Sequence, residues 1–326
     1  AMPPMGQALW VSRAHRSKVA FSCEMRAMMI ATPYLLYLGN STDPYAIKTA
    51  RGLAVFRPEQ CVAEYRSDEC PLTLGLPRMS FSEAVAKGAR TMVLGIVNSG
   101  GTLEKTVIED ATKAMEAGLD LASGLHRRLK DDPRLVEAAQ RTGRLLHDVR
   151  DPPEGLMVGT GDPRPGNRLL TVGTDCSSGK MYTTLALQRG MHARGIACDF
   201  RATGQTGILV AGAGIPLDAV VADFISGAIE QLAPARHDGG WDLIEGQGSL
   251  FHPSFAGVST GLLHGAQPAA LVMCHDPTRR VMRGLTHRAP PDLAECIAAN
   301  LATAHLTSPD VRMIGIALNT SSLAQN

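Results

Sequence analysis

The chain has 326 residues with a formal net charge of +1 at pH 7; 44% of the residues are hydrophobic, 19% charged and 4% aromatic. This length suits two ordinary domains, and this composition is typical of a soluble globular protein. The near-neutral charge and the few aromatic side chains exclude a large basic or base-stacking surface, so we expect no nucleic-acid partner.

The first thirty residues are basic at intervals and weakly apolar, without a clean hydrophobic region or a small-residue cleavage site. We expect residues 1–30 to be a disordered leader, with a transit peptide as the alternative.

Residues 31–150 alternate short apolar runs with helical patterns. The apolar runs cover 34–40 and 91–101, and the helical candidates cover 43–56, 80–89, 102–118 and 132–146. This alternation predicts an α/β domain with a parallel sheet. Because ligands gather beyond the carboxyl ends of parallel strands, we expect binding loops at Asn40 and at Asn98–Gly101.

A second α/β domain is predicted for residues 168–326, after a Pro/Gly-rich linker at 151–167. Its expected strands cover 168–175, 196–204, 241–249, 269–277 and 311–321, and its expected helices cover 179–195, 216–233 and 290–306.

The cysteines show no sign of a disulfide framework or a zinc site. The seven are scattered, odd in number and without a CxxC pair, which indicates reduced thiols in the cytoplasm. No apolar run approaches the roughly 20 residues of a membrane-spanning helix, so we expect no membrane partner.

The segment GTDCSSGKM has the features of a phosphate-binding loop. It follows an expected strand and opens an expected helix, so its backbone N–H groups and the helix N-terminus would face an anion, beside the charge of a lysine. We expect the whole segment to contact the phosphates: Gly173, Thr174, Asp175, Cys176, Ser177, Ser178, Gly179, Lys180 and Met181.

Met181 stands where nucleotide-hydrolysing loops place the hydroxyl that holds Mg²⁺. A thioether is a poor ligand for so hard a cation, and Thr183 or Thr184 would have to replace it from outside the usual position. The loop therefore predicts a diphosphate held without a metal.

Three residues are candidates for a general base. Glu245 ends an apolar strand close to the expected loop, His252 follows seven residues later, and Asp223 lies in the expected helix 216–233. A solvated Glu245 and a structural His252 are the alternatives, and Asp218 is five residues from Asp223, so these two acids do not share a helix face.

Substrate carboxylates would be bound by arginine and amide side chains. Arg201 and Gln205 flank a glycine-rich turn, and Arg279 lies in a basic segment where it could share a helical face with Arg283. A solvated basic helix end is the alternative for this segment.

Together, several motifs resemble one P-loop family, long catalogued as a domain of unknown function, that carries its own Rossmann-like N-terminal domain. They are GTDCSSGKMYT, ATGQTGILVAG, DLIEGQGSLFHP, LGNSTDPYAIKTARGL and VLGIVNSGG, and the resemblance spans the chain after Met29. It implies a Rossmann-like N-terminal domain and a P-loop NTPase-like C-terminal domain. Ser177 and Ser178 depart from it, because smaller or apolar residues are expected there.

The resemblance also implies a chemistry, because the family includes D-glutamate N-acetyltransferases. It implies acetyl-CoA as co-substrate, D-glutamate as substrate, a place in D-amino acid catabolism and no metal. A homo-oligomer is expected because two-domain α/β enzymes often associate. The acetyl group could pass directly to the amine. Alternatively, Cys176 could accept it first, since a thiol at a helix N-terminus has a lowered pKa.

Two other functions stay open. The loop spacing also resembles that of dethiobiotin synthetase, which would make the protein a Mg-ATP-dependent ligase or kinase with Glu245 and Asp175 holding magnesium. A nucleotide- or CoA-sensing protein without turnover is the third possibility.

Overall fold

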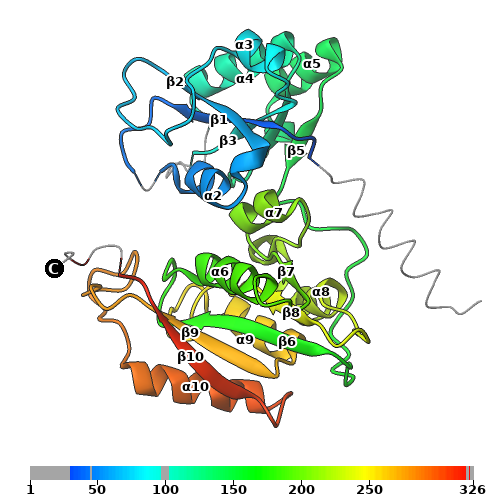
Figure 1. Cartoon of the computed structure of the whole chain (residues 1–326), viewed down its shortest axis with the longest axis vertical. Helices are drawn as coiled ribbons and strands as arrows, with labels where there is room; N and C mark the ends of the chain where they lie inside the picture. The colour runs from blue at the N-terminus through cyan, green and yellow to red at the C-terminus, as the bar shows by residue number, and fades with distance from the viewer. Residues whose placement is uncertain (1–29, 45, 97–102, 321–322, 324–326) are drawn as a thin grey trace, which may run out of the picture.

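The computed structural model describes residues 30–44, 46–96, 103–320 and 323. Two α/β units lie one above the other along the longest axis (Figure 1). The expected leader, apart from Ile30, and the expected binding loop Asn98–Gly101 lie outside the described residues. Residues 151–166 contain no helix or strand; the domain boundaries stay predictions.

The N-terminal unit is built on a parallel five-stranded sheet in the order β2-β1-β3-β4-β5. The strands are β1 (Tyr34–Gly39), β2 (Cys61–Arg66), β3 (Thr91–Leu94), β4 (Asp120–Ser123) and β5 (Leu146–Asp148), and the helices are α2 (Lys48–Phe56), α3 (Phe81–Ala86), α4 (Lys105–Ala117) and α5 (Pro133–Thr142), with 3₁₀ turns η1 (Pro58–Gln60) and η2 (Leu129–Asp131). All six β1 residues are buried.

Local sequence signals explain several of these helix ends. Ser80 and Glu83 form a reciprocal capping box at the start of α3. Asp132 caps α5, which begins with Pro133. Gly118 ends α4 at a φ of 109°, a left-handed conformation that suits glycine.

The C-terminal unit carries a second parallel five-stranded sheet, in the order β10-β9-β6-β8-β7. The strands are β6 (Asn167–Gly173), β7 (Cys198–Arg201), β8 (Trp241–Ile244), β9 (Ala270–His275) and β10 (Arg312–Leu318), and the helices are α6 (Lys180–His192), α7 (Gln205–Ala211), α8 (Ile225–Leu232), α9 (Ala256–Ala266) and α10 (Leu293–His305). The α/β fold with two parallel sheets is confirmed.

The long helix expected at 216–233 is wrong over its first half. Only α8 is α-helical, and two 3₁₀ turns precede it, η3 (Leu217–Ala219) and η4 (Ala222–Phe224). The helix expected around Arg279 and Arg283 is also wrong, because residues 276–284 form turns.

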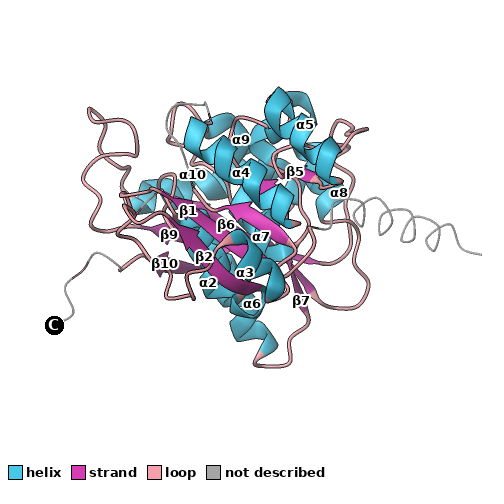
Figure 2. Ribbon diagram, turned by 90° about the horizontal axis from the view of Figure 1, so that it is seen from above, coloured by secondary structure: helices cyan, strands magenta, loops and turns pink. Residues whose placement is uncertain are grey.

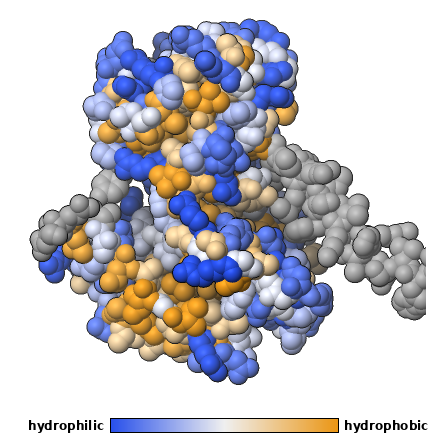
Figure 3. All heavy atoms as spheres, viewed as in Figure 1, coloured by the Kyte–Doolittle hydropathy of each residue, from blue (hydrophilic) through white to orange (hydrophobic). Residues whose placement is uncertain are grey.

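Helices cover both faces of each sheet (Figure 2). In the C-terminal unit, α8, α9 and α10 pack on one face and α6 on the other. Three apolar side chains of the edge strand β10 are exposed: Ile314, Ile316 and Leu318. Figure 3 shows hydrophobic residues gathered over this part of the surface. No helix in the described ranges is both long and apolar enough to cross a bilayer.

The two units share a hydrophobic core. Leu36 and Leu53 of the N-terminal unit cluster with Phe200, Ile208 and Leu209 of the C-terminal unit. In Figure 1, α7 lies between the two sheets. Because the cluster draws side chains from both units, burying it fixes one unit against the other.

Polar contacts also join the two units at this boundary, which we call the seam. The hydroxyl groups of Thr49 and Thr206 form a hydrogen bond of 3.0 Å. Arg150, which follows β5, donates to the Gly124 carbonyl at 2.8 Å, to Gln205 Oε1 at 3.1 Å and to the Asp218 carboxylate. The loops after β4 and β5 are thus tied to the start of α7.

We expect Arg150→Met to lower the free energy of unfolding by about 2 kcal/mol, because it leaves the Asp218 carboxylate and the Gly124 carbonyl without their partner. The Arg150 side chain is only 12% exposed. A fall in Tm of about 4–8 °C would report this loss in thermal denaturation.

The matched control is Arg128→Met. Arg128 pairs with Asp151 at 2.7 Å, but its side chain is 51% exposed, so its loss is expected to cost less than about 1 kcal/mol. Equal effects of the two variants would contradict the role given to Arg150.

Candidate functional site

The phosphate-binding loop joins β6 to α6, as expected. Ser177 has a φ of 51° and Gly179 a φ of 100°, and Gly179 is the residue before α6. Left-handed backbone at a serine costs about 1 kcal/mol or more, so the surrounding contacts hold the loop in this shape. The buried Thr174 helps, since its hydroxyl lies 3.1 Å from His275 Nδ1 and its N–H bonds the Cys274 carbonyl.

Lys180 is buried beneath the loop. Its ammonium donates to the Asp175 carbonyl at 2.8 Å and to Ser178 Oγ at 3.4 Å. Burial is the main cause that lowers the pKa of Lys180. A phosphate in this loop would therefore bring the lysine a counter-charge that the loop carbonyl does not supply.

Asp175 ties the loop to the turns after β9. Its Oδ1 accepts from Cys176 N–H at 2.7 Å, and its Oδ2 accepts from Arg279 Nη1 at 2.7 Å and from Arg283 N–H at 2.8 Å. Arg279 also donates to the carbonyls of Cys176 and Ser177 at 2.5 and 3.1 Å. Arg279, expected to bind substrate, thus holds the loop itself.

Glu245 follows β8 directly and is buried beside the loop. Its Oε2 accepts from Thr203 N–H at 2.9 Å and from Gly204 N–H at 3.1 Å, while Oε1 has no hydrogen-bond partner among the described residues. Burial raises the pKa of Glu245 to about 7, against the opposing effect of the two N–H donors and Lys180. A carboxyl group with this pKa can exchange a proton near neutral pH.

The other two base candidates lie in different surroundings. His252 is buried, with Nδ1 accepting from Ser254 N–H at 3.2 Å and Nε2 at 3.0 Å from the Arg283 carbonyl, so both ring nitrogens are engaged. Asp223 is exposed on η4, and no hydrogen bond or ion pair joins it to another described residue. In the described part of the chain, no hydrogen bond or ion pair joins either residue to Glu245 or Lys180.

The remaining substrate candidates have partners within the chain. Arg201 bonds the buried Asp242 carboxylate at 2.9 and 2.8 Å, in an ion-pair network with Arg236. Gln205 accepts from Arg150 at the seam. The charge of Arg201 is therefore already balanced, whereas Gln205 lies at the boundary between the two units.

One group in the described part of the chain could hold a metal ion by distance alone. Ligand atoms of Asp175, Cys176 and His252 lie within 4.8 Å of one another. However, both oxygens of Asp175 and both ring nitrogens of His252 already take part in hydrogen bonds. A metal here would have to displace these contacts, so the donor set does not fit an ion well.

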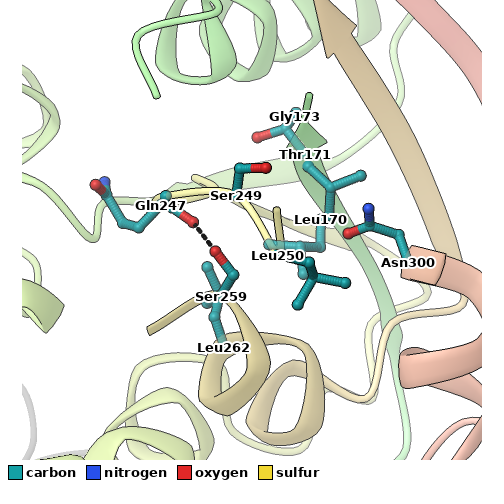
Figure 4. Close-up of a pocket in the computed structure, with 11 residues that line it drawn as sticks. Leu170, Thr171, Gly173, Gln247, Ser249, Leu250, Ser259, Leu262 and Asn300 are labelled. Carbon is teal, nitrogen blue, oxygen red and sulfur yellow. Dashed lines mark hydrogen bonds between the residues drawn. The ribbon is translucent and has the colours of Figure 1, made fainter. Parts of the chain in front are cut away.

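A small cavity lies behind the loop, between β6, α9 and α10 (Figure 4). Thr171, Gly173, Ser249 and Asn300 are among its lining residues, and Ser259 Oγ donates to the Gln247 carbonyl beside it at 2.8 Å. Its volume of about 10 Å³ suits one water molecule, so it is not the ligand site.

Two site residues escaped the sequence reasoning. Lys48 begins α2 and Arg150 follows β5, and both lie at the seam between the two units. Arg150 had no signal because β5 has only three residues. Lys48 did leave a signal in the sequence, because a lysine in the first turn of a helix is repelled by the positive end of the helix dipole.

Comparison with known proteins adds the family to this geometry. Residues 157–326 match DUF1611, described as a domain of unknown function with a P-loop, and residues 64–152 match DUF1611_N, described as a Rossmann-like domain of unknown function. The chain belongs to the DUF1611 family. A crystal structure of a DUF1611 family protein from Anabaena variabilis superposes with a TM-score of 0.81 at 33% identity, covering 90% of each chain.

Two characterised relatives of this DUF1611 protein carry the same name. D-glutamate N-acetyltransferases from a Pseudoalteromonas species and from Tritonibacter scottomollicae are each 50% identical over 297 residues. The match covers 91% of this chain and 90% and 89% of the relatives. The chain is therefore an enzyme of the acyltransferase class.

Alkylation of Cys176 is expected to be slow, because burial raises the pKa of its thiol despite the nearby Lys180. This direction is opposite to the one expected for a thiol at a helix N-terminus. The rate with iodoacetamide, followed by peptide mass spectrometry, should still increase above about pH 9. A rate that levels off near pH 7 would instead indicate an activated thiolate.

Proposed function

We propose that this enzyme transfers the acetyl group of acetyl-CoA to the α-amine of D-glutamate. The observation that carries the proposal is the 50% identity, over nearly the whole chain, to two proteins named for this reaction. The site geometry supports it, because a phosphate-binding loop and a buried carboxyl group adjoin each other.

The loop would hold the diphosphate of acetyl-CoA. Its backbone N–H groups, the start of α6 and the Lys180 ammonium all favour an anion at this place. Acetyl transfer leaves the diphosphate intact, so no metal is needed to neutralise charge on a breaking phosphate bond. Met181 at the usual magnesium position fits that chemistry.

Glu245 would act as the general base. The amine nitrogen of D-glutamate attacks the thioester carbonyl carbon, and Glu245 takes the proton that the amine releases. The C–N bond forms as the C–S bond breaks, and Glu245 gives its proton to the departing sulfur, so that coenzyme A leaves as the thiol. Backbone N–H groups of the glycine-rich loops would stabilise the negative charge on the carbonyl oxygen.

Direct transfer is favoured over an acetyl-cysteine intermediate. A cysteine attacks a thioester as the thiolate, and the raised pKa of Cys176 keeps its thiol protonated at neutral pH. Cys176 is better explained as a loop residue whose carbonyl accepts from Arg279.

The ligase or kinase alternative requires Glu245 and Asp175 as magnesium ligands. Both oxygens of Asp175 are hydrogen-bonded, and Glu245 Oε2 is held by two backbone donors. Thr184, a possible replacement for Met181, donates to the Lys180 carbonyl at 2.8 Å. Because these groups already have hydrogen-bond partners, a magnesium ion would have to displace them, which favours the acetyltransferase.

We also propose a cellular compartment, an oligomeric state and a metabolic role for this enzyme. Six described cysteines are free thiols, which supports a reducing compartment such as the cytoplasm. The exposed apolar side chains of the edge strand β10 support a homo-oligomer, since such an edge is a ready pairing surface. We place the reaction in D-amino acid catabolism, without a nucleic-acid or membrane partner.

Lys180→Ala is expected to raise the Kd for acetyl-CoA about 10- to 100-fold, the loss typical of a charged hydrogen bond. Calorimetry in the presence of EDTA would measure it. Lys105→Ala is the control, because that side chain is 84% exposed on α4. Magnesium-dependent ATP binding by a protein that does not bind CoA would support the ligase or kinase instead.

Glu245→Gln is expected to lower kcat about 10²- to 10⁴-fold, and wild-type kcat should rise with pH to a plateau above about pH 7, since the base must be ionised. The folded protein holds this proton more tightly than the unfolded chain. The wild type should therefore lose stability relative to Glu245→Gln as pH rises from about 4.5 to 7.

Asp223→Asn is the control for this base, because Asp223 lies exposed on η4. It should keep near-wild-type kcat and the same pH profile. A large loss of kcat in Asp223→Asn, together with a Glu245→Gln variant that stays active, would identify Asp223 as the general base.

A further inference from the structure

Three helices begin close to one another at the seam. Thr49 in the first turn of α2 bonds Thr206 in the first turn of α7 at 3.0 Å. A Cβ on Gly52 would lie 3.5 Å from the methyl of Met181, in the first turn of α6. The first turns of the two longer helices, α2 and α6, contain no acidic residue, so their positive dipole ends are uncompensated.

Cationic side chains gather at the same place. Lys48 is the first residue of α2 and is half-buried, and Arg283 is exposed on the turns that bond Asp175. Burial lowers the pKa of Lys48, and the positive charges of Arg283 and Arg150 lower it further. The fold thus holds like charges together, against their mutual repulsion.

Three acids near this place already have partners of their own. Asp218 pairs with Arg150, Asp175 accepts from Arg279, and Glu245 accepts from two backbone N–H groups. Among the described residues, neither the Lys48 ammonium nor the Arg283 guanidinium has an ion pair or a hydrogen bond. Such a pair of unpaired cations at converging helix N-termini is suited to an anionic ligand.

We propose that Lys48 and Arg283 bind the side-chain carboxylate of the amino-acid substrate across the seam between the two units. This inference rests on the proposed function. The amine has to reach Glu245 in the C-terminal unit, so the group that extends toward α2 is the other end of the substrate. Lys48 and Arg283 then select a substrate with an acidic side chain. One of these two cations, Lys48, belongs to the N-terminal unit.

A phosphate group of coenzyme A is the other anion that this chemistry could bind. The test therefore compares two ratios of kcat/KM in each variant. The first ratio is D-glutamate over D-glutamine, which differ in the side-chain charge. The second is acetyl-CoA over acetyl-dephospho-CoA, which differ in the 3′-phosphate.

Lys48→Met and Arg283→Gln should each lower the first ratio at least about 10-fold, the loss typical of a charged hydrogen bond, and leave the second within about twofold. Lys48→Arg should keep most of the first ratio. The controls are Arg51→Gln on the same helix and Arg280→Gln near Arg283, because both side chains are exposed. Neither control should change either ratio.

An unchanged first ratio in both variants overturns the inference and leaves the proposed function standing. A fall in the second ratio alone also overturns it, and assigns the cations to coenzyme A. A wild type that acetylates neither amino acid overturns the proposed function, and this inference with it. Arg283 lies on an exposed turn, so Arg283→Gln gives the answer even where Lys48→Met fails to fold.

Discussion

Four consecutive residues at the start of α7 hold the site together. Thr203 and Gly204 donate their backbone N–H groups to Glu245, Gln205 accepts from Arg150, and Thr206 bonds Thr49. This short segment therefore joins the end of β8, the end of β5 and the start of α2. The position of the buried carboxyl group and the closure of the seam depend on the same stretch of backbone.

Burial gives the site its electrostatic character. It favours the neutral form of both Lys180 and Glu245, lowering the pKa of the lysine and raising that of the carboxyl. A diphosphate in the loop would favour the charged form of Lys180. Glu245, by contrast, stays near the point where it gains or loses a proton, so the two groups can serve different tasks within one buried region.

The sequence predicted the fold class and the loop because both leave strong local patterns. β6, the glycine-rich turn and α6 lie where the motif placed them. The short strands β4 and β5 were missed because three or four residues carry too little periodicity. The helix α9 was missed because Gly257, Gly261 and Gly265 lower its helix propensity; the last two let it approach Ile225 and Ser226 closely.

The candidate site was predictable only in part, for a similar reason. A motif shows which residues adjoin a loop, but the partner of a side chain depends on tertiary contacts. Arg279 and Arg201 both look suited to a carboxylate in the sequence, yet one bonds Asp175 and the other Asp242. Lys48 and Arg150 belong to the N-terminal unit, and they approach residues of the C-terminal unit only through the packing of the two units.

This shared seam has a consequence for how such proteins change over time. Each unit matches its own domain family, yet the apolar cluster at the seam draws side chains from both. Recombination that brought in a foreign Rossmann-like unit would mismatch the apolar cluster and discard Lys48 and Arg150 together. The two halves are therefore expected to be inherited as a pair, with changes at α2 accompanied by changes at the start of α7.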